Sequence, residues 1–142
     1  MSGIQIENLV KTYGDNIAVN GLNLNLEKGK VYGFLGPNGA GKSTTMNIIT
    51  GYIGATGGTV KIDGYDIFKE PEKAKKRVGY LPEIPPLYQD MTVKEYLVFV
   101  TELKKIPAKE KMKNIKEVLE MTKTTQVENR LIKNLSKGYK QR

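Results

Sequence analysis

The sequence is organised around one glycine-rich stretch, Gly36-Pro37-Asn38-Gly39-Ala40-Gly41-Lys42-Ser43-Thr44. It matches the pattern G-x-x-x-x-G-K-[ST], the phosphate-binding loop of proteins that bind nucleoside triphosphates. Because glycine has no Cβ, the backbone N–H groups of such a loop can turn inward and surround the phosphates. The helix expected to begin near Lys42 directs the positive end of its dipole at the same anion. We therefore predict that Lys42 binds the β- and γ-phosphates and that the Ser43 hydroxyl binds Mg²⁺.

The residues on either side of the loop agree with this interpretation. A phosphate loop follows a buried strand and opens a helix. The apolar run at residues 30–35 precedes the loop and predicts a strand that is buried on both faces. Residues 43–50 follow the loop and predict a helix that ends at Gly51. This context disfavours an accidental match to the pattern.

The composition excludes several other classes of protein. The chain has 142 residues, enough for one ordinary domain with a core. It has no cysteine, which excludes a disulfide framework and a thiolate metal site. The longest apolar stretches, such as residues 96–100, are too short to span a bilayer, and the N-terminus lacks the pattern of a signal peptide. We therefore expect a cytoplasmic protein.

The charge of the chain is basic, with a net value of +8 from 23 basic and 15 acidic residues. Such a balance can indicate a nucleic-acid or membrane partner. The lysines, however, are scattered through expected helices and turns, as at residues 73–77 and 104–116, which is typical of a solvated face. We therefore expect no nucleic-acid partner.

The N-terminal part predicts an antiparallel β layer. Ile4 and Ile6 alternate with polar neighbours, and residues 22–26 alternate strictly between leucine and asparagine. Between these strands, Tyr13 stands beside Gly14. Packing would explain this aromatic ring, and so would stacking on a purine base. The residues alone do not decide between the two.

The segment after the first helix alternates strands and turns. Residues 57–64 predict a short strand closed by a turn, in which Asp63 is more readily a turn residue than a catalytic one. Residues 71–77 predict a brief basic helix, and residues 78–81 another buried strand. The proline-rich residues 82–86 predict a loop after that strand, where α/β proteins place functional groups.

The C-terminal part predicts helices. Thr92 and Glu95 form the pattern of a capping box that opens an amphipathic helix, and a second helix is expected after Pro107. The apolar stripes of both helices are typical of core positions. Residues 134–142 resemble the opening of a further helix and stop without a C-cap, so we expect the chain to be truncated.

Across its whole length the sequence resembles the ATP-binding subunit of ABC transporters. Residues 36–44 are similar to that family's phosphate loop, and Tyr13 matches its adenine-stacking aromatic residue. The stretch Leu135-Ser136-Lys137-Gly138-Tyr139 resembles the family signature, usually Leu-Ser-Gly-Gly-Gln. The resemblance implies an α/β phosphate-loop NTPase core with an N-terminal antiparallel β subdomain (residues 1–91), followed by a helical subdomain (residues 92–142). It also implies that the chain ends before the strand that carries the acidic Walker B residues.

The resemblance implies a site that is shared between two subunits. Two ABC subunits would meet head to tail, so that the signature of one subunit closes over the ATP of the other. Ser136 would contribute to this closure, although a simple helix-capping role is the alternative. Mg²⁺ would be held by Ser43 and Glu83. The residues implied to bind ATP are Tyr13, Gly36, Asn38, Gly39, Ala40, Gly41, Lys42, Ser43 and Thr44, and those implied to reach the partner's ATP are Leu135, Ser136, Lys137 and Gly138.

Three positions depart from the family pattern. Glu83 stands where the family has a glutamine that touches Mg²⁺ and the attacking water, and its charge would lie near the γ-phosphate. Lys137 and Tyr139 replace a glycine and a glutamine of the signature. Such departures resemble the exporter branch that pairs with ABC-2-type membrane proteins.

The function implied is that of an ATP-binding subunit, peripheral on the inner face of the cell membrane, which couples ATP binding and hydrolysis to transport through a separate membrane permease. The chain has no histidine and no run of four apolar residues followed by Asp-Glu, so the groups that position water are missing. We therefore expect ATP binding without turnover and no catalytic residue in this chain. The alternatives are a soluble ABC-type ATPase acting on ribosomes or DNA, and a non-catalytic binding module. Missing strands would leave bare sheet edges, so we also expect a marginal fold or pairing with a second copy.

Overall fold

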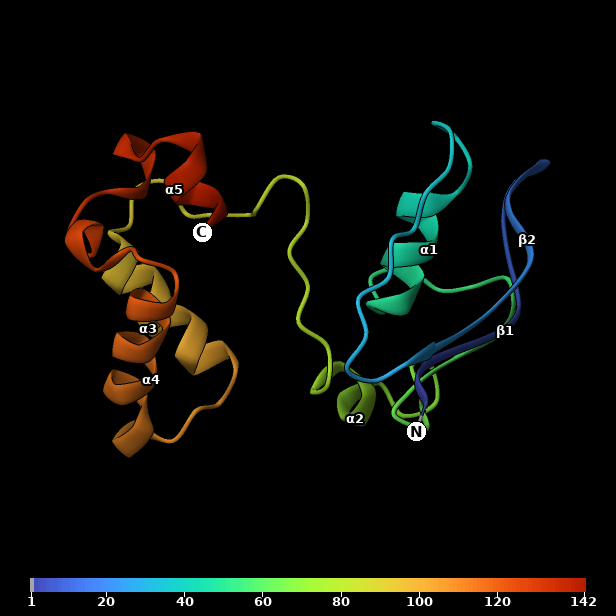
Figure 1. Cartoon of the computed structure of the whole chain (residues 1–142), viewed down its shortest axis with the longest axis horizontal. Helices are drawn as coiled ribbons and strands as arrows, with labels where there is room; N and C mark the ends of the chain where they lie inside the picture. The colour runs from blue at the N-terminus through green and yellow to red at the C-terminus, as the bar shows by residue number, and fades with distance from the viewer. Residues whose placement is uncertain (1) are drawn as a thin grey trace. The chain divides into compact units, whose positions relative to one another are not determined.

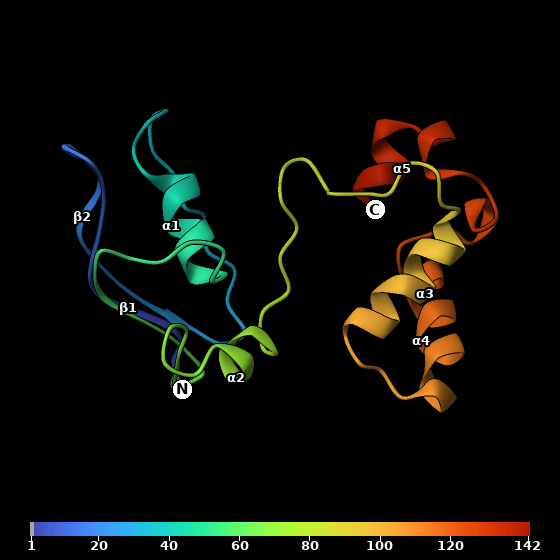
Figure 2. The ribbon, with the colours of Figure 1, turned by 180° about the vertical axis from the view of Figure 1, so that it is seen from behind.

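The structure is a computed structural model that describes residues 2–142, and the chain folds as two compact units. The first unit extends to Tyr80 and the second covers Leu81–Arg142. Figures 1 and 2 show the elements of each unit from opposite sides. The first contains β1 (Ser2–Tyr13), β2 (Asn16–Glu27), α1 (Lys42–Ile49), β3 (Gly57–Ile62), β4 (Tyr65–Asp66) and α2 (Pro71–Lys75); the second contains α3 (Val93–Leu103), α4 (Ala108–Met121), η1 (Thr125–Val127), η2 (Ile132–Asn134) and α5 (Lys137–Gln141).

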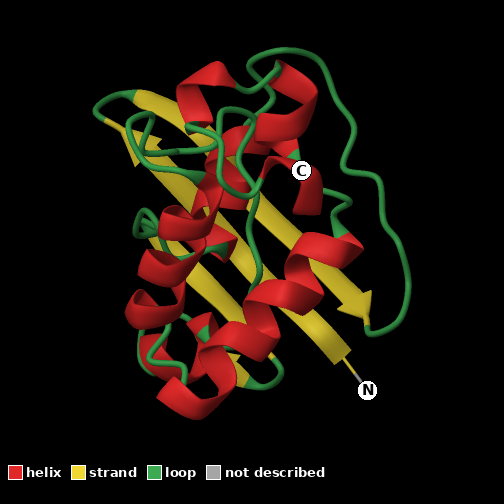
Figure 3. Ribbon diagram, turned by 90° about the vertical axis from the view of Figure 1, so that its left-hand side faces the viewer, coloured by secondary structure: helices red, strands yellow, loops and turns green. Residues whose placement is uncertain are grey.

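The first unit is built on an antiparallel sheet, as the sequence predicts. Its strand order is β2-β1-β3-β4, and every neighbouring pair is antiparallel (Figure 3). β1 and β2 form a hairpin in which Tyr13 pairs with Asn16. The turn between them begins with Gly14 at a φ of 58°, a conformation that glycine adopts without steric cost. β1 therefore continues through Tyr13, beyond Ile4 and Ile6, the apolar residues whose alternation predicts this strand.

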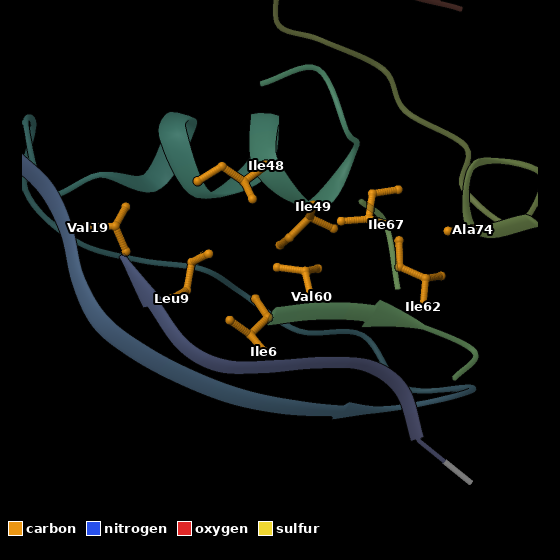
Figure 4. Packing of buried hydrophobic residues seen from close by; sticks show 9 residues of the cluster. All are labelled: Ile6, Leu9, Val19, Ile48, Ile49, Val60, Ile62, Ile67 and Ala74. Carbon is orange, nitrogen blue, oxygen red and sulfur yellow. The ribbon is translucent and has the colours of Figure 1, made fainter. Parts of the chain in front are cut away.

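The core of the first unit lies between this sheet and α1. Ile48 and Ile49 of α1 face Ile6 and Leu9 of β1 and Val60 of β3, and all five are buried (Figure 4). Burying one such side chain contributes about 1.5–3 kcal/mol. The helix predicted at residues 43–50 is confirmed as α1, whose C-cap residue Thr50 precedes Gly51 at a φ of 68°.

Two predicted strands are absent from the structure. Residues 30–35 and 78–81 have no regular secondary structure, and Val31 and Leu35 are 101% and 91% exposed. In the part of the chain that the structure describes, no strand pairs with either segment. A buried parallel strand takes its backbone hydrogen bonds and its burial from neighbouring strands, so neither segment pairs on its own. Both strand predictions are therefore wrong for this structure.

The second unit is helical. The predicted capping box is confirmed: the Thr92 N–H donates to Glu95 Oε2 at 2.7 Å, and the Glu95 N–H donates to Thr92 Oγ1 at 3.2 Å. These bonds satisfy two N–H groups at the start of α3. The helix predicted after Pro107 is confirmed as α4, which buries Ile115 and Leu119.

Residues 81–91, which the sequence places with the β layer, lie in the second unit. The carbonyl oxygen of Met91 accepts from the Ile132 N–H at 2.9 Å, and that of Gln89 accepts from the Lys133 N–H at 3.0 Å. The Lys133 ammonium also lies 3.0 Å from Asp90 Oδ1. These long-range bonds hold the segment to η2.

Candidate nucleotide-binding site

The phosphate loop borders a cavity of about 380 Å³ in the first unit. This volume lies within the range of small-molecule sites in proteins. One wall comes from the loop and the start of α1, and the other comes from the β1–β2 hairpin. The lining residues are Tyr13, Asn16, Ile17, Ala18, Asn38, Gly39, Gly41, Lys42, Ser43 and Thr44. Of the expected ATP-binding residues, Gly36 and Ala40 are outside this lining.

Gly41 sets the position of the loop against β2. Its φ is 79°, and a Cβ at this position would overlap the carbonyl oxygen of Ala18. Only glycine combines this backbone conformation with such a close approach. Since α1 begins at the next residue, its N-terminal N–H groups and the positive end of its dipole face the cavity region.

The Lys42 ammonium folds back across the phosphate loop. Its Nζ donates to the carbonyl oxygens of Gly36 and Pro37, each at 2.6 Å. These bonds hold a positive charge beside the loop, where a phosphate can exchange for the carbonyl oxygens as its partner. The charge-assisted bonds to a phosphate would be stronger than those to neutral carbonyls.

A magnesium ion fits this site through oxygen ligands. Ser43 is exposed in the first turn of α1 and lines the cavity, so its hydroxyl can bind a hard cation. Among residues 2–142 there is no group of three or more acidic or histidine side chains that could hold a metal. Mg²⁺ is commonly held by one or two protein ligands together with phosphates and water, so one hydroxyl is compatible with its binding. Glu83, the other expected ligand, is exposed in the second unit.

Tyr13 is 51% exposed and forms part of the cavity wall. Core packing therefore does not account for its ring, and its role in stacking on a base stays a prediction. The sequence interpretation missed Asn16, Ile17 and Ala18, which line the cavity opposite the loop. The signal was present in the Gly14-Asp15 pair, because a two-residue hairpin turn places the following residues opposite Tyr13.

The expected signature residues lie in the second unit, at the start of α5. Ser136 Oγ accepts from the Tyr139 N–H at 3.3 Å and thereby caps this helix. The Tyr139 hydroxyl accepts from Gln126 Nε2 at 2.8 Å, and the Arg142 guanidinium lies 5.5 Å from the Tyr139 ring centroid. Ser136 and its neighbour Lys137 are exposed. The capping role of Ser136 is present, and its expected contact with ATP stays a prediction.

Asp63 is a turn residue, as the sequence favours. It has a φ of 52° in the turn between β3 and β4. Its carboxylate lies 2.9 Å from Lys28 Nζ and 3.5 Å from Arg77 Nε. These contacts fasten the turn to neighbouring segments of the first unit.

Helices long and apolar enough to cross a lipid bilayer are absent from the described part of the chain.

Known proteins resemble this chain in both sequence and fold. A family profile described as ABC transporter matches residues 19–142. The linearmycin resistance ATP-binding protein of Bacillus subtilis (strain 168) is 39% identical over 139 residues, which are 98% of this chain and 45% of that protein. The bacitracin transport ATP-binding protein of Bacillus licheniformis is 37% identical over 139 residues, 98% of this chain and 44% of that protein. The chain thus spans less than half the length of these relatives.

Two solved structures share the arrangement. The ATP-binding subunit of an ABC transporter superposes with a TM-score of 0.85 at 26% identity, covering 98% of this chain and 58% of that one. A nucleotide-free ATP-binding cassette from an ABC transporter gives a TM-score of 0.76 at 31% identity, covering 96% and 60%. Together with the phosphate loop and its cavity, these matches establish that the chain belongs to the ABC transporter family and corresponds to part of its ATP-binding domain.

Proposed function

We propose that this chain binds MgATP in the cavity between the phosphate loop and the β1–β2 hairpin. The triphosphate would lie on the loop, with the Lys42 ammonium on the β- and γ-phosphates and Ser43 on Mg²⁺. The base would stack on Tyr13. Gly36, Asn38, Gly39, Ala40, Gly41 and Thr44 would complete the loop around the phosphates.

This proposal rests on one observation, which is that Tyr13 and Lys42 line the same cavity. A tyrosine and a lysine contribute to the same lining although they are distant in the sequence. A nucleotide offers a flat base at one end and a polyanion at the other, so a site with these two groups is complementary to it.

Calorimetric titration with MgATP tests the proposal. Lys42→Ala should weaken binding about 10- to 150-fold, because a charged hydrogen bond contributes about 1.5–3 kcal/mol. Tyr13→Ala should weaken it about 5- to 150-fold, since base stacking contributes about 1–3 kcal/mol. The matched control is Tyr52→Ala, which removes a tyrosine of the same unit that is 81% exposed and outside the cavity lining. Equal affinity of Lys42→Ala and the wild type would contradict the site.

We further propose that Leu135, Ser136, Lys137 and Gly138 close over the ATP of a second copy. The exposure of Ser136, Lys137 and Gly138 supports this, because these groups are accessible to a partner. MgATP should then raise the sedimentation coefficient of the wild type, and Gly138→Asp should abolish the increase. A Cβ at Gly138 would come no closer than 4.0 Å to Ser136 Oγ, so the variant should fold. An increase that persists in this variant would argue against closure by the signature.

We infer that these 142 residues bind ATP without steady turnover. The sequence has neither a histidine nor an Asp-Glu pair after an apolar strand, the groups the family uses to position water. Glu83 stands at the position of the family's glutamine and would supply an oxygen ligand to Mg²⁺. Steady phosphate release from the pure chain that Lys42→Ala abolishes would overturn this inference.

The whole protein would serve as the ATP-binding subunit of an exporter, on the inner face of the membrane and paired with a separate membrane permease. The names of the two Bacillus relatives, for bacitracin transport and linearmycin resistance, support this assignment. Their likeness favours a transporter over an ATPase that acts on ribosomes or DNA. Co-purification of the tagged protein with a membrane protein from solubilised membranes, lost on removal of that partner's gene, would test the pairing.

A further inference from the structure

The side chain of Lys11 contacts the ring of Tyr13, which forms part of the cavity wall. The Lys11 ammonium lies 4.9 Å from the centroid of the Tyr13 ring. This distance is within the range of a cation–π contact. Tyr13 is one of the described residues that line the cavity, whereas Lys11 is not. The ammonium therefore contacts the ring without occupying the space available to a ligand.

Lys11 is itself held by the backbone of a distant segment. Its Nζ donates to the carbonyl oxygen of Gly54 at 2.8 Å, across 43 residues of sequence. This bond fixes the end of a side chain that is otherwise flexible. The ammonium is thus placed by two partners at once, the Tyr13 ring and the Gly54 backbone carbonyl.

The neighbours of Lys11 strengthen the same connection. The Thr12 N–H donates to Thr56 Oγ1 at 3.0 Å, and the two threonine hydroxyl oxygens are 3.2 Å apart. The Thr56 N–H in turn donates to the Val10 carbonyl oxygen at 2.9 Å. The end of β1 is therefore tied to residues 54–56, which lead from α1 into β3. α1 carries Lys42 and Ser43 at its other end. The end of β1 that carries Tyr13 is therefore connected to the phosphate loop through residues 54–56 and α1.

We infer that Lys11 is a positioning residue that holds the Tyr13 ring in place for stacking on the base. This inference rests on the proposed nucleotide site. A tyrosine that is half exposed samples several orientations, and a ligand that stacks on it must select one of them. An ammonium fixed against the ring limits these orientations before the ligand arrives. Lys11 should therefore strengthen only the part of the affinity that comes from the base.

Two ligands separate the base from the phosphates in a titration of the full chain. MgATP offers both, whereas magnesium tripolyphosphate offers the phosphates alone. Lys11→Met keeps a long unbranched side chain but removes the ammonium with its charge and its N–H donors, and it should weaken MgATP binding about 2- to 5-fold. The affinity for tripolyphosphate should not change. Lys11→Arg retains a cation and N–H donors and should restore binding.

The control is Lys61→Met, which removes the same charge from neighbouring β3, outside the cavity lining. It should change neither affinity. A second test combines Lys11→Met with Tyr13→Ala, in which the lysine change should have no further effect because its ring is gone.

The outcomes are distinguishable. An unchanged MgATP affinity in Lys11→Met, or an equal loss for both ligands, would overturn the positioning role while leaving the nucleotide site intact. If Lys42→Ala changed the affinity for neither ligand, or if the wild-type chain bound neither ligand, the proposed site would be overturned and this inference with it.

Discussion

Gly41 packs directly against the carbonyl oxygen of Ala18, so that the phosphate loop touches β2 where no side chain fits. A Cβ on Gly41 would overlap this oxygen and lie 3.2 Å from Val19 Cγ2. The φ of 79° independently favours glycine. This contact holds one wall of the cavity against the other.

Substitution of Gly41 should therefore be costly for folding. Gly41→Ala combines backbone strain of about 1–3 kcal/mol with a steric overlap of similar cost. The matched control is Gly29→Ala, where φ is 74° but nothing lies within 4 Å of the new Cβ. Urea unfolding followed by circular dichroism should show a loss of about 2–5 kcal/mol for Gly41→Ala and only the strain component for Gly29→Ala. Equal losses would show that the Ala18 contact is unimportant.

The sheet–helix core depends on Ile48, which is fully buried between α1 and the sheet. Ile48→Ala should lower the free energy of unfolding by about 2–5 kcal/mol, because it removes apolar contacts and leaves a cavity. Ile84→Ala makes the same chemical change at a site that is 83% exposed and should cost little. Chemical denaturation of both variants checks this contrast, and similar losses at the two sites would argue against the described core.

The capping box should contribute measurably to the second unit. Thr92→Ala removes the acceptor of the Glu95 N–H and should destabilise the unit by about 0.5–2 kcal/mol. Lys113→Ala, on the exposed side of α4, serves as the control and should have a near-neutral effect. The thermal midpoint followed at 222 nm is the measurement. A Thr92→Ala midpoint equal to the wild type would mean that water replaces the cap without cost.

Acidification should weaken the same cap. The hydrogen bond from the Thr92 backbone N–H, followed by that from the Thr92 hydroxyl, lowers the pKa of Glu95 below its usual value. The unfolded chain, with an ordinary pKa of about 4.3, then binds more protons as the pH falls. The contribution of Glu95 is thus fully present above this value and is lost as the pH drops through the lowered folded pKa.

Glu95→Gln keeps a hydrogen-bonding side chain and removes the titration, so it is the control for this effect. The thermal midpoint of the wild type should fall more steeply than that of Glu95→Gln between about pH 5 and pH 3. Parallel curves would show that the carboxylate contributes nothing to the pH dependence.

Sequence signals that act over a few residues predicted helix starts and strands correctly. The glycines before Lys42, the Thr92–Glu95 pair and Pro107 each place a helix start correctly, because the groups involved are within a few residues of one another. The alternation at residues 22–26 identifies a strand for the same reason, since its period is a property of one segment.

Segments that depend on distant partners were less predictable. Residues 30–35 and 78–81 have the composition of buried strands but are not strands here, because their hydrogen bonds and burial must come from neighbouring strands. The sequence groups residues 81–91 with the β layer, whereas the structure holds them in the second unit through bonds from Ile132 and Lys133.

By itself, the sequence determined the phosphate loop, the helix that follows it, the antiparallel β layer and the capped helices. Tertiary structure alone decided that the phosphate loop packs beside the β1–β2 hairpin to form the cavity and that the Gly54 carbonyl holds Lys11 against Tyr13. The physical reason is the range of the interactions: capping and periodicity act within a few residues, whereas these contacts exist only after the chain has brought distant segments together.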